Sequence, residues 1–156
     1  MAGVSTAAPY RHFTDKEALI RAILVEGYEL FNESLAEAYA RGKSPQGRIT
    51  ELGVAYVRFA EQHPAHFRVM FGLAGSAGDK PLDAEPTGFL LLVEGIEALQ
   101  PQSSAEQRRD LVVACWSIVH GFAMLLIDGA FAATMGMADA EGQLRRTLGV
   151  MISGRE

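Results

Sequence analysis

The amino-acid sequence predicts an all-α fold, a bundle of about seven helices. Along most of the chain, apolar residues recur at intervals of three and four, as they do on one face of an α-helix. Ser, Thr or Asp residues stand where several of these runs begin, in positions that cap helices. No segment shows the alternation of apolar and polar residues that is typical of a half-buried strand.

The composition is that of one globular domain. The chain has 156 residues, of which 49 % are hydrophobic and 21 % are charged, and this balance excludes a disordered chain. The single cysteine, Cys115, cannot form a disulfide within the chain, and the first residues do not resemble a signal peptide. Both observations favour a cytoplasmic protein.

The charge is unevenly distributed. The formal net charge is −5, but residues 1–25 carry +1 and the remainder therefore carries −6. A slightly basic end on an acidic body fits a protein that touches phosphates with one end only. Chance is the alternative explanation for the same split.

The first long helix is expected to begin after Thr14 and to end near Arg41. Thr14 and Glu17 form a capping box, in which the Thr caps the helix and the Glu stands at its third position. The apolar residues that follow at helical spacing are Leu19, Ile20, Ile23, Leu24, Leu30, Phe31, Leu35 and Tyr39.

The second helix is expected to begin at Ser44 and Pro45, a cap followed by a first-turn proline. Pro64 should interrupt it and open a short helix through Phe71. Residues 72–85, "GLAGSAGDKPLDAE", predict a mobile loop. The apolar stripe of the second helix is Ile49, Leu52, Tyr56, Phe59 and Ala60.

Three further segments complete the predicted bundle. Residues 86–99 form a helix that is apolar nearly all round and is therefore expected to be buried. Ser103 and Glu106 form a second capping box, which opens the helix that contains the apolar residues 111–127. Asp139 caps the last helix.

The apolar stretch 111–127 is 17 residues long, at the short limit for a membrane span, and it carries His120 at its middle. A soluble explanation suits it better, because both of its faces can be buried in a homodimer. One face is bulky and suits the domain's own core or a cavity: Trp116, His120, Met124, Ile127 and Phe131. The opposite face is small and flat: Ala114, Ile118, Gly121, Leu125 and Ala132.

A homodimer is therefore predicted, and no membrane association. Two helices of each subunit, residues 111–127 and 143–152, would pair around a two-fold axis. The predicted interface residues are Ala114, Ile118, Gly121, Leu125, Leu144, Leu148, Met151 and Ile152.

Aromatic and flexible side chains could line a pocket for a small apolar or amphipathic effector. For any single one of them, filling of an ordinary core is the favoured explanation. The candidate ligand-binding residues are Tyr56, Phe59, Phe67, Met70, Phe71, Phe89, Trp116, His120 and Met124.

An enzyme is not expected. Cys115 and His120 are separated by about 140° around a helix, which argues against a nucleophile pair. His63 and His66 straddle Pro64 without a partnered carboxylate motif, so no metal site and no cofactor is predicted. No glycine motif that cradles phosphates is present.

Three stretches carry a resemblance to a known family. The segment "GVSTAAPYRHFTDKEALIRAI" resembles the recognition half of a TetR-type transcriptional repressor. The segments "YVRFAEQHPAHFRVMFG" and "WSIVHGFAMLLIDGAF" resemble the regulatory domain of a TetR subgroup named for a Trp-His-Gly pattern, here Trp116, His120 and Gly121. The resemblance implies a TetR-like helical bundle, and it favours the pocket over plain core filling.

The resemblance also implies a recognition helix at residues 5–11. Tyr10, His12 and Lys16 would contact phosphates of operator DNA, and Thr6 and Ala7 would approach bases or backbone in the major groove. Arg11 belongs to the same implied DNA-binding set. Packing roles and a solvated Lys16 are the alternatives.

In the family, one helix and most of a second precede this recognition helix, and neither is found before Gly3. We therefore expect residues 1–20 to be the remnant of a helix-turn-helix domain, with impaired DNA binding, and residues 21–156 to form the ligand-binding and dimerisation domain. The function implied for the intact protein is a ligand-responsive repressor. A helical ligand-binding or interaction module that never binds DNA is the alternative, and an enzyme is a third.

Overall fold

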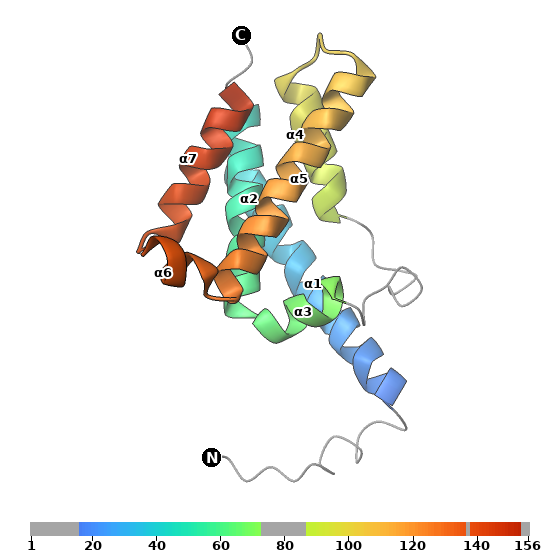
Figure 1. Cartoon of the computed structure of the whole chain (residues 1–156). Coiled ribbons are helices and arrows are strands. Elements are labelled where there is room, and N and C mark those ends of the chain that lie inside the picture. Colours follow the sequence, from blue (N-terminus) through green and yellow to red (C-terminus); the bar gives the residue numbers. More distant parts are fainter. Residues whose placement is uncertain (1–15, 73–86, 137, 154–156) are drawn as a thin grey trace.

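The computed structural model describes residues 16–72, 87–136 and 138–153, and every structural statement below concerns these residues. They form a bundle of helices without strands, which confirms the all-α prediction (Figure 1). The helices are α1 (Lys16–Arg41), α2 (Pro45–Gln62), α3 (Pro64–Phe71), α4 (Thr87–Leu99), α5 (Ala105–Ile127), α6 (Ala130–Met135) and α7 (Ala140–Ser153).

Helix α2 occupies the centre of the bundle and packs against α1, α3, α4, α5 and α7 (Figure 1). It begins where the sequence predicts, because the Ser44 hydroxyl accepts a hydrogen bond from the Gly47 amide at 3.0 Å and Pro45 opens the first turn. Its predicted apolar stripe is buried throughout. It ends at His63, where Pro64 starts α3 in a new direction.

Helix α1 runs without a break from Lys16 to Arg41, and its lower turns project beyond the other helices in Figure 1. It buries Leu24, Phe31 and Leu35 in the core. The boundary that we expected between residues 20 and 21 falls inside this helix. The predicted cap Thr14 and most of the predicted loop 72–85 lie outside the described residues.

Helix α4 forms as predicted, but it is not buried all round. Leu92 and Ile96 are in the core, whereas the side chains of Phe89 and Leu90 are about half exposed. The prediction of complete burial is wrong because α4 packs on α1, α2 and α5 with one side only.

Helix α5 differs from the prediction at its start, and the two faces predicted for it extend beyond its end. Its capping box is formed by Ser104 and Gln107, one residue later than Ser103 and Glu106. Its last residue is Ile127, with Asp128 as the C-cap, because Gly129 takes a left-handed conformation (φ 73°) that a residue with a Cβ rarely adopts. Phe131 and Ala132 therefore belong to the short helix α6 and not to the two faces predicted for α5.

The buried side of α5 lies on neither of the two predicted faces. It is centred on Cys115 and Val119, so that Trp116, predicted to face the core or a cavity, is at its edge and 45 % exposed. Leu125, predicted for a partner subunit, is 47 % exposed and remains available to one. The core residues of α5 are Leu111, Val112, Cys115, Val119, Phe122 and Ala123.

Helix α7 begins as predicted, since Asp139 Oδ1 accepts a hydrogen bond from the Gly142 amide at 2.8 Å. Its apolar stripe, however, is used within the subunit. Leu144, Leu148 and Ile152 are only 1 %, 1 % and 7 % exposed. The subunit itself therefore covers this stripe, because α7 packs against α2 and α5 of its own chain, and the place of these residues in a dimer interface stays a prediction.

Among the described residues, α5 is the one helix whose length and apolar composition would allow it to cross a membrane. In the bundle it packs against α2, α4, α6 and α7. Core helices of soluble proteins pass the same test of length and composition.

Candidate functional site

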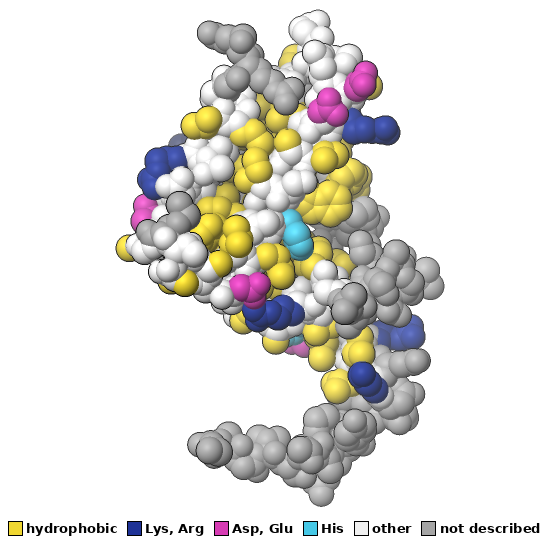
Figure 2. All heavy atoms as spheres, viewed as in Figure 1, with side chains coloured by type: hydrophobic (Ala, Val, Ile, Leu, Met, Phe, Trp, Pro, Cys, Tyr) yellow, Lys and Arg dark blue, Asp and Glu magenta, His cyan; other side chains and the backbone are white. Residues whose placement is uncertain are grey.

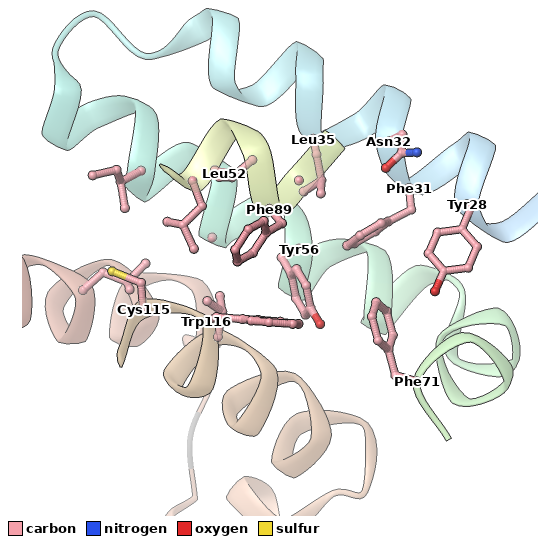
Figure 3. A pocket seen from close by; sticks show the side chains of 16 residues that line it. Tyr28, Phe31, Asn32, Leu35, Leu52, Tyr56, Phe71, Phe89, Cys115 and Trp116 are labelled. Atoms are coloured by element: carbon pink, nitrogen blue, oxygen red, sulfur yellow. The ribbon is translucent and has the colours of Figure 1, made fainter. Parts of the chain in front are cut away.

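A largely apolar cavity of about 320 Å³ opens between α1, α2, α4 and α5 (Figure 3). Its volume is at the lower end of the range for small-molecule sites. Every long helix of the bundle contributes to its wall, so the packing of the helices determines its shape. The lining residues are Tyr28, Phe31, Asn32, Leu35, Ile49, Leu52, Gly53, Tyr56, Phe71, Gly88, Phe89, Leu92, Cys115, Trp116, Val119 and Leu148.

Aromatic rings form two parts of this wall. The ring of Phe31 lies edge-on to Tyr56 and Phe71, with centroid separations of 5.2 and 5.8 Å. On another part of the wall, Phe89 lies edge-on to Trp116 at 5.7 Å. Such edge-to-face pairs hold rings in defined orientations, so the cavity has rigid apolar walls suited to an aromatic or aliphatic guest.

The polar groups on the wall are few and uncharged. Tyr28, Tyr56 and Asn32 contribute hydroxyl or amide groups, and the described lining residues include no Asp, Glu, Lys, Arg or His. The Tyr28 hydroxyl oxygen is buried and forms no hydrogen bond with a described protein group. Burial raises the pKa of Tyr28, so this hydroxyl stays protonated at neutral pH.

Tyr56 is connected to α5 by hydrogen bonding. Its hydroxyl lies 2.9 Å from Nδ1 of His120. Burial raises the pKa of Tyr56, so its hydroxyl is neutral at physiological pH. Burial also lowers the pKa of His120, which favours a neutral imidazole. A second, shallower hollow lies beside this contact and is lined by Phe71, Trp116, Ser117 and His120.

The structure places the predicted ligand residues in three different surroundings. Tyr56, Phe71, Phe89 and Trp116 line the cavity, and His120 lines the hollow beside it. Phe59, Phe67 and Met70 are buried in the core, and Met124 is partly buried against it; none of these four lines either space.

The sequence analysis missed the contribution of α1 to the cavity. Tyr28, Phe31, Asn32 and Leu35 repeat at intervals of three and four, which places them on one side of that helix. This spacing was visible in the sequence, but it looks the same whether the facing space is filled or empty.

The described residues around the cavity offer few groups that could act in catalysis. Burial raises the pKa of the Cys115 thiol to about 11, so it remains a neutral thiol at physiological pH. In the described ranges, no group of three or more His, Cys, Asp or Glu side chains could hold a metal ion. The arrangement is suited to binding an apolar molecule.

The comparisons with known proteins agree with a regulatory role. Residues 49–151, about two thirds of the chain, match the family described as tetracyclin repressor-like, C-terminal domain. The chain belongs to the TetR family. The matched region includes most of α2, all of α3 to α6 and most of α7, and therefore most of the cavity wall.

Solved structures share the fold of this TetR-family chain. A protein of unknown function from Rhodococcus sp. RHA1 superposes with a TM-score of 0.77 at 24 % identity, over 98 % of this chain and 79 % of that one. SCO4313, described as a candidate regulatory protein, gives a TM-score of 0.64 at 20 % identity, over 98 % and 81 %. A search of curated proteins found no match.

The residues that a TetR-type regulator would use on DNA are almost all beyond the described part of this chain. Thr6, Ala7, Tyr10, Arg11 and His12 lie outside the described residues. Lys16, the remaining member of that set, is the first residue of α1 and is exposed. The DNA-binding set therefore stays a prediction.

Proposed function

We propose that this TetR-family protein is a ligand-responsive transcriptional repressor whose small apolar or amphipathic effector binds in the cavity. The observation that carries the proposal is the course of α1. Its middle turns line the cavity through Tyr28, Phe31 and Leu35, and its first residue is Lys16, next to the segment that resembles a recognition helix.

A mechanism follows from the stiffness of α1. A helix of 26 residues is about 39 Å long at 1.5 Å per residue. A molecule that wedges between α1 and α5 would favour a bundle in which α1 is tilted. The resulting displacement would be largest at the N-terminal end of α1, near Lys16. Binding shifts the population only as far as the ligand prefers that state. Recognition helices of a dimer would then no longer match successive major grooves, about 34 Å apart.

Dimerisation is the second part of the proposal. The face of α5 that stays exposed includes Val113, Leu125 and Gly121, and no described atom lies within 4 Å of a Cβ built on Gly121. On α7, Val150 is largely exposed. Figure 2 shows hydrophobic side chains gathered over α5 and α7 on this face. A second copy that packs there would bury them.

The test uses the full product of the gene and DNA from the region upstream of that gene. Trp116 lines the cavity and is the only tryptophan of the chain, so its emission reports on cavity occupancy. Compounds that change this emission are then added to a gel-shift with the upstream DNA. The proposal expects a specific shifted band that such compounds release.

Two alternative classes give different results. A helical ligand-binding module that never acts on DNA would change Trp116 emission without shifting any upstream fragment. An enzyme would convert the bound compound, which mass spectrometry of the recovered ligand would detect. Release of the intact compound, together with a band that it abolishes, would support the repressor.

A further inference from the structure

The hollow beside the cavity has the composition of a second small-molecule site. It measures about 230 Å³, and the described residues that line it are Phe71, Trp116, Ser117 and His120. Two aromatic rings and two polar side chains suit a ligand with an apolar body and one polar group. Phe71 and Trp116 also line the cavity, so the two spaces adjoin at these side chains.

The hydrogen bond between Tyr56 and His120 determines which ring nitrogen carries the proton. The buried Tyr56 hydroxyl is protonated at neutral pH, and Nδ1 of His120 is the one described acceptor with which it forms a hydrogen bond, at 2.9 Å. A buried hydroxyl that donated to no acceptor would be destabilising, so Tyr56 donates and Nδ1 accepts. The proton of the neutral imidazole then lies on Nε2.

The Nε2 atom of His120 is therefore a donor, and it is accessible. It forms no hydrogen bond with a described protein group. It is also not among the buried unpartnered polar atoms of the described residues, which are two tyrosine hydroxyls. A molecule in the hollow that His120 lines can therefore reach it. Phe67 stacks on the imidazole at 5.7 Å and Phe71 lies edge-on to it at 5.5 Å, so the ring has a defined orientation.

The surroundings of this donor favour a neutral acceptor. Among the described residues that line the hollow there is no Asp, Glu, Lys or Arg. Burial lowers the pKa of His120, which keeps the imidazole neutral at pH 7. A carboxylate would lose part of its hydration there without meeting a positive charge. A carbonyl oxygen has less hydration to lose and accepts the same hydrogen bond.

We propose that the hollow binds a small neutral molecule with an apolar body, which packs against Phe71 and Trp116, and an acceptor oxygen, which accepts a hydrogen bond from Nε2 of His120. Tyr56 is a positioning residue of this site, because its hydroxyl keeps the proton on Nε2. The site is separate from the cavity and does not depend on the cavity being the effector site.

Nitrogen-15 NMR of the histidine side chains tests the position of the proton without a ligand. The unmodified protein should show His120 with a protonated Nε2 and an unprotonated Nδ1, and loss of the signal in His120→Asn assigns it. Tyr56→Phe removes the hydroxyl and should raise the fraction of His120 that carries its proton on Nδ1. A protonated Nδ1 in the unmodified protein would overturn the proposed site. An unchanged distribution in Tyr56→Phe would refute the positioning role of Tyr56.

Acetophenone and ethylbenzene test the binding, since they share a body and differ in the carbonyl oxygen. NMR titrations follow the Nε2 proton of His120, and the ratio of the two affinities is compared between proteins so that the different hydration of the probes cancels. In His120→Asn, which keeps an acceptor for Tyr56, Trp116 reports the binding, and the ratio should fall roughly three- to tenfold, the effect of one hydrogen bond.

Ser117→Ala is the matched control, because Ser117 is the other polar residue of the hollow. The affinity ratio should stay unchanged in this variant. A ratio that falls in Ser117→Ala and not in His120→Asn would assign the donor to Ser117 and overturn the role of His120. Benzoate, an anion at neutral pH, should bind more weakly than acetophenone, and tighter binding of benzoate would refute the neutral class.

The variant Leu52→Phe separates the hollow from the cavity. Leu52 lines the cavity and does not line the hollow, whereas Trp116 lines both. Acetophenone should still shift the His120 signal in Leu52→Phe with unchanged affinity. Loss of that shift in a variant with unchanged melting temperature would refute the hollow as a separate site. If no probe shifts the His120 signal of the unmodified protein, the hollow is not a binding site, while the cavity proposed for the effector is unaffected.

Discussion

The hydroxyl of Tyr56 on α2 lies 2.9 Å from Nδ1 of His120 on α5, and this contact bridges the two central helices beside the ligand cavity. Aromatic rings surround it, since Phe67 stacks on the imidazole at 5.7 Å and Phe71 lies edge-on to it at 5.5 Å. The pair holds Tyr56 in place as part of the cavity wall. It also makes the stability of the fold depend on a group that titrates near neutral pH.

Acidification should destabilise the protein through His120. Burial lowers the pKa of this imidazole in the folded state, whereas in the unfolded chain it stays at about 6.5. The unfolded state therefore binds more protons below that pH, and stability falls as the pH drops from about 6.5 toward the folded pKa. Above about 6.5, His120 contributes no pH dependence. Melting temperatures measured between pH 8 and 5 check this.

The variant His120→Asn separates this effect from the other titrating groups. Its amide does not titrate but can still hydrogen-bond to Tyr56. Its melting temperature should fall less over the same pH interval than that of the unmodified protein. Parallel pH profiles of the two proteins would rule out His120 as the source.

The ion pair between α2 and α7 should matter more than an isolated surface pair. Arg145 meets Glu51 at 2.6 Å and Glu141 at 3.0 Å, and its hydrogen bond lowers the pKa of Glu51. Because these side chains are partly exposed, Arg145→Ala should cost only about 1 kcal/mol in the free energy of unfolding. Urea denaturation measures this.

Arg146 provides the control for Arg145. It is the next residue on α7, and its nearest carboxylate, that of Asp139, is 3.9 Å away with both side chains largely exposed. Arg146→Ala should change the free energy of unfolding by less than about 0.5 kcal/mol. Equal losses for both variants would mean that the pair with Glu51 contributes nothing specific.

Leu125→Glu should convert the proposed dimer to folded monomers. Leu125 is half exposed in the subunit, so the charge disturbs only a surface that a second copy would cover. Two such charges near a two-fold axis would be buried without partners, which costs several kcal/mol. Light scattering at micromolar concentration should show a halved mass, with unchanged helical circular dichroism.

Leu148→Glu is the contrasting variant. Leu148 is 1 % exposed and belongs to the subunit's own core, so a charge there should unfold the chain itself. A monomeric mass for the unmodified protein would refute the proposed interface whatever the variants do.

Filling the cavity should remove ligand binding without loss of the fold. Leu52 lines the cavity from α2 (Figure 3). In Leu52→Phe the larger ring extends into existing space, so the cost to stability should stay below the 1–3 kcal/mol that is typical of overpacking a filled core. Calorimetry should show weaker binding of a compound that changes Trp116 emission in the unmodified protein. Unchanged affinity in a variant with unchanged melting temperature would place the ligand elsewhere.

The sequence by itself determined the helices and most of their ends. Ser44 with Pro45, Pro64 and Asp139 act within one or two turns of chain, because caps and prolines satisfy or remove hydrogen bonds of their own helix. Short sequence motifs, among them the pattern of Trp116, His120 and Gly121, made the family recognisable. Where it failed locally, the competing signals were adjacent: Ser104 and not Ser103 caps α5, and Gly129 ends it before Phe131.

Only the tertiary structure decided which apolar helix faces are buried inside the subunit and where a cavity remains between the helices. Leu144 and Leu148 have the periodicity of an interface stripe, but α2 and α5 cover them. Tyr28 and Phe31 have the periodicity of a core stripe, but they face a cavity. Periodicity reports the direction of a side chain around its own helix. What lies opposite depends on helices far away in the sequence, whose packing no local pattern records.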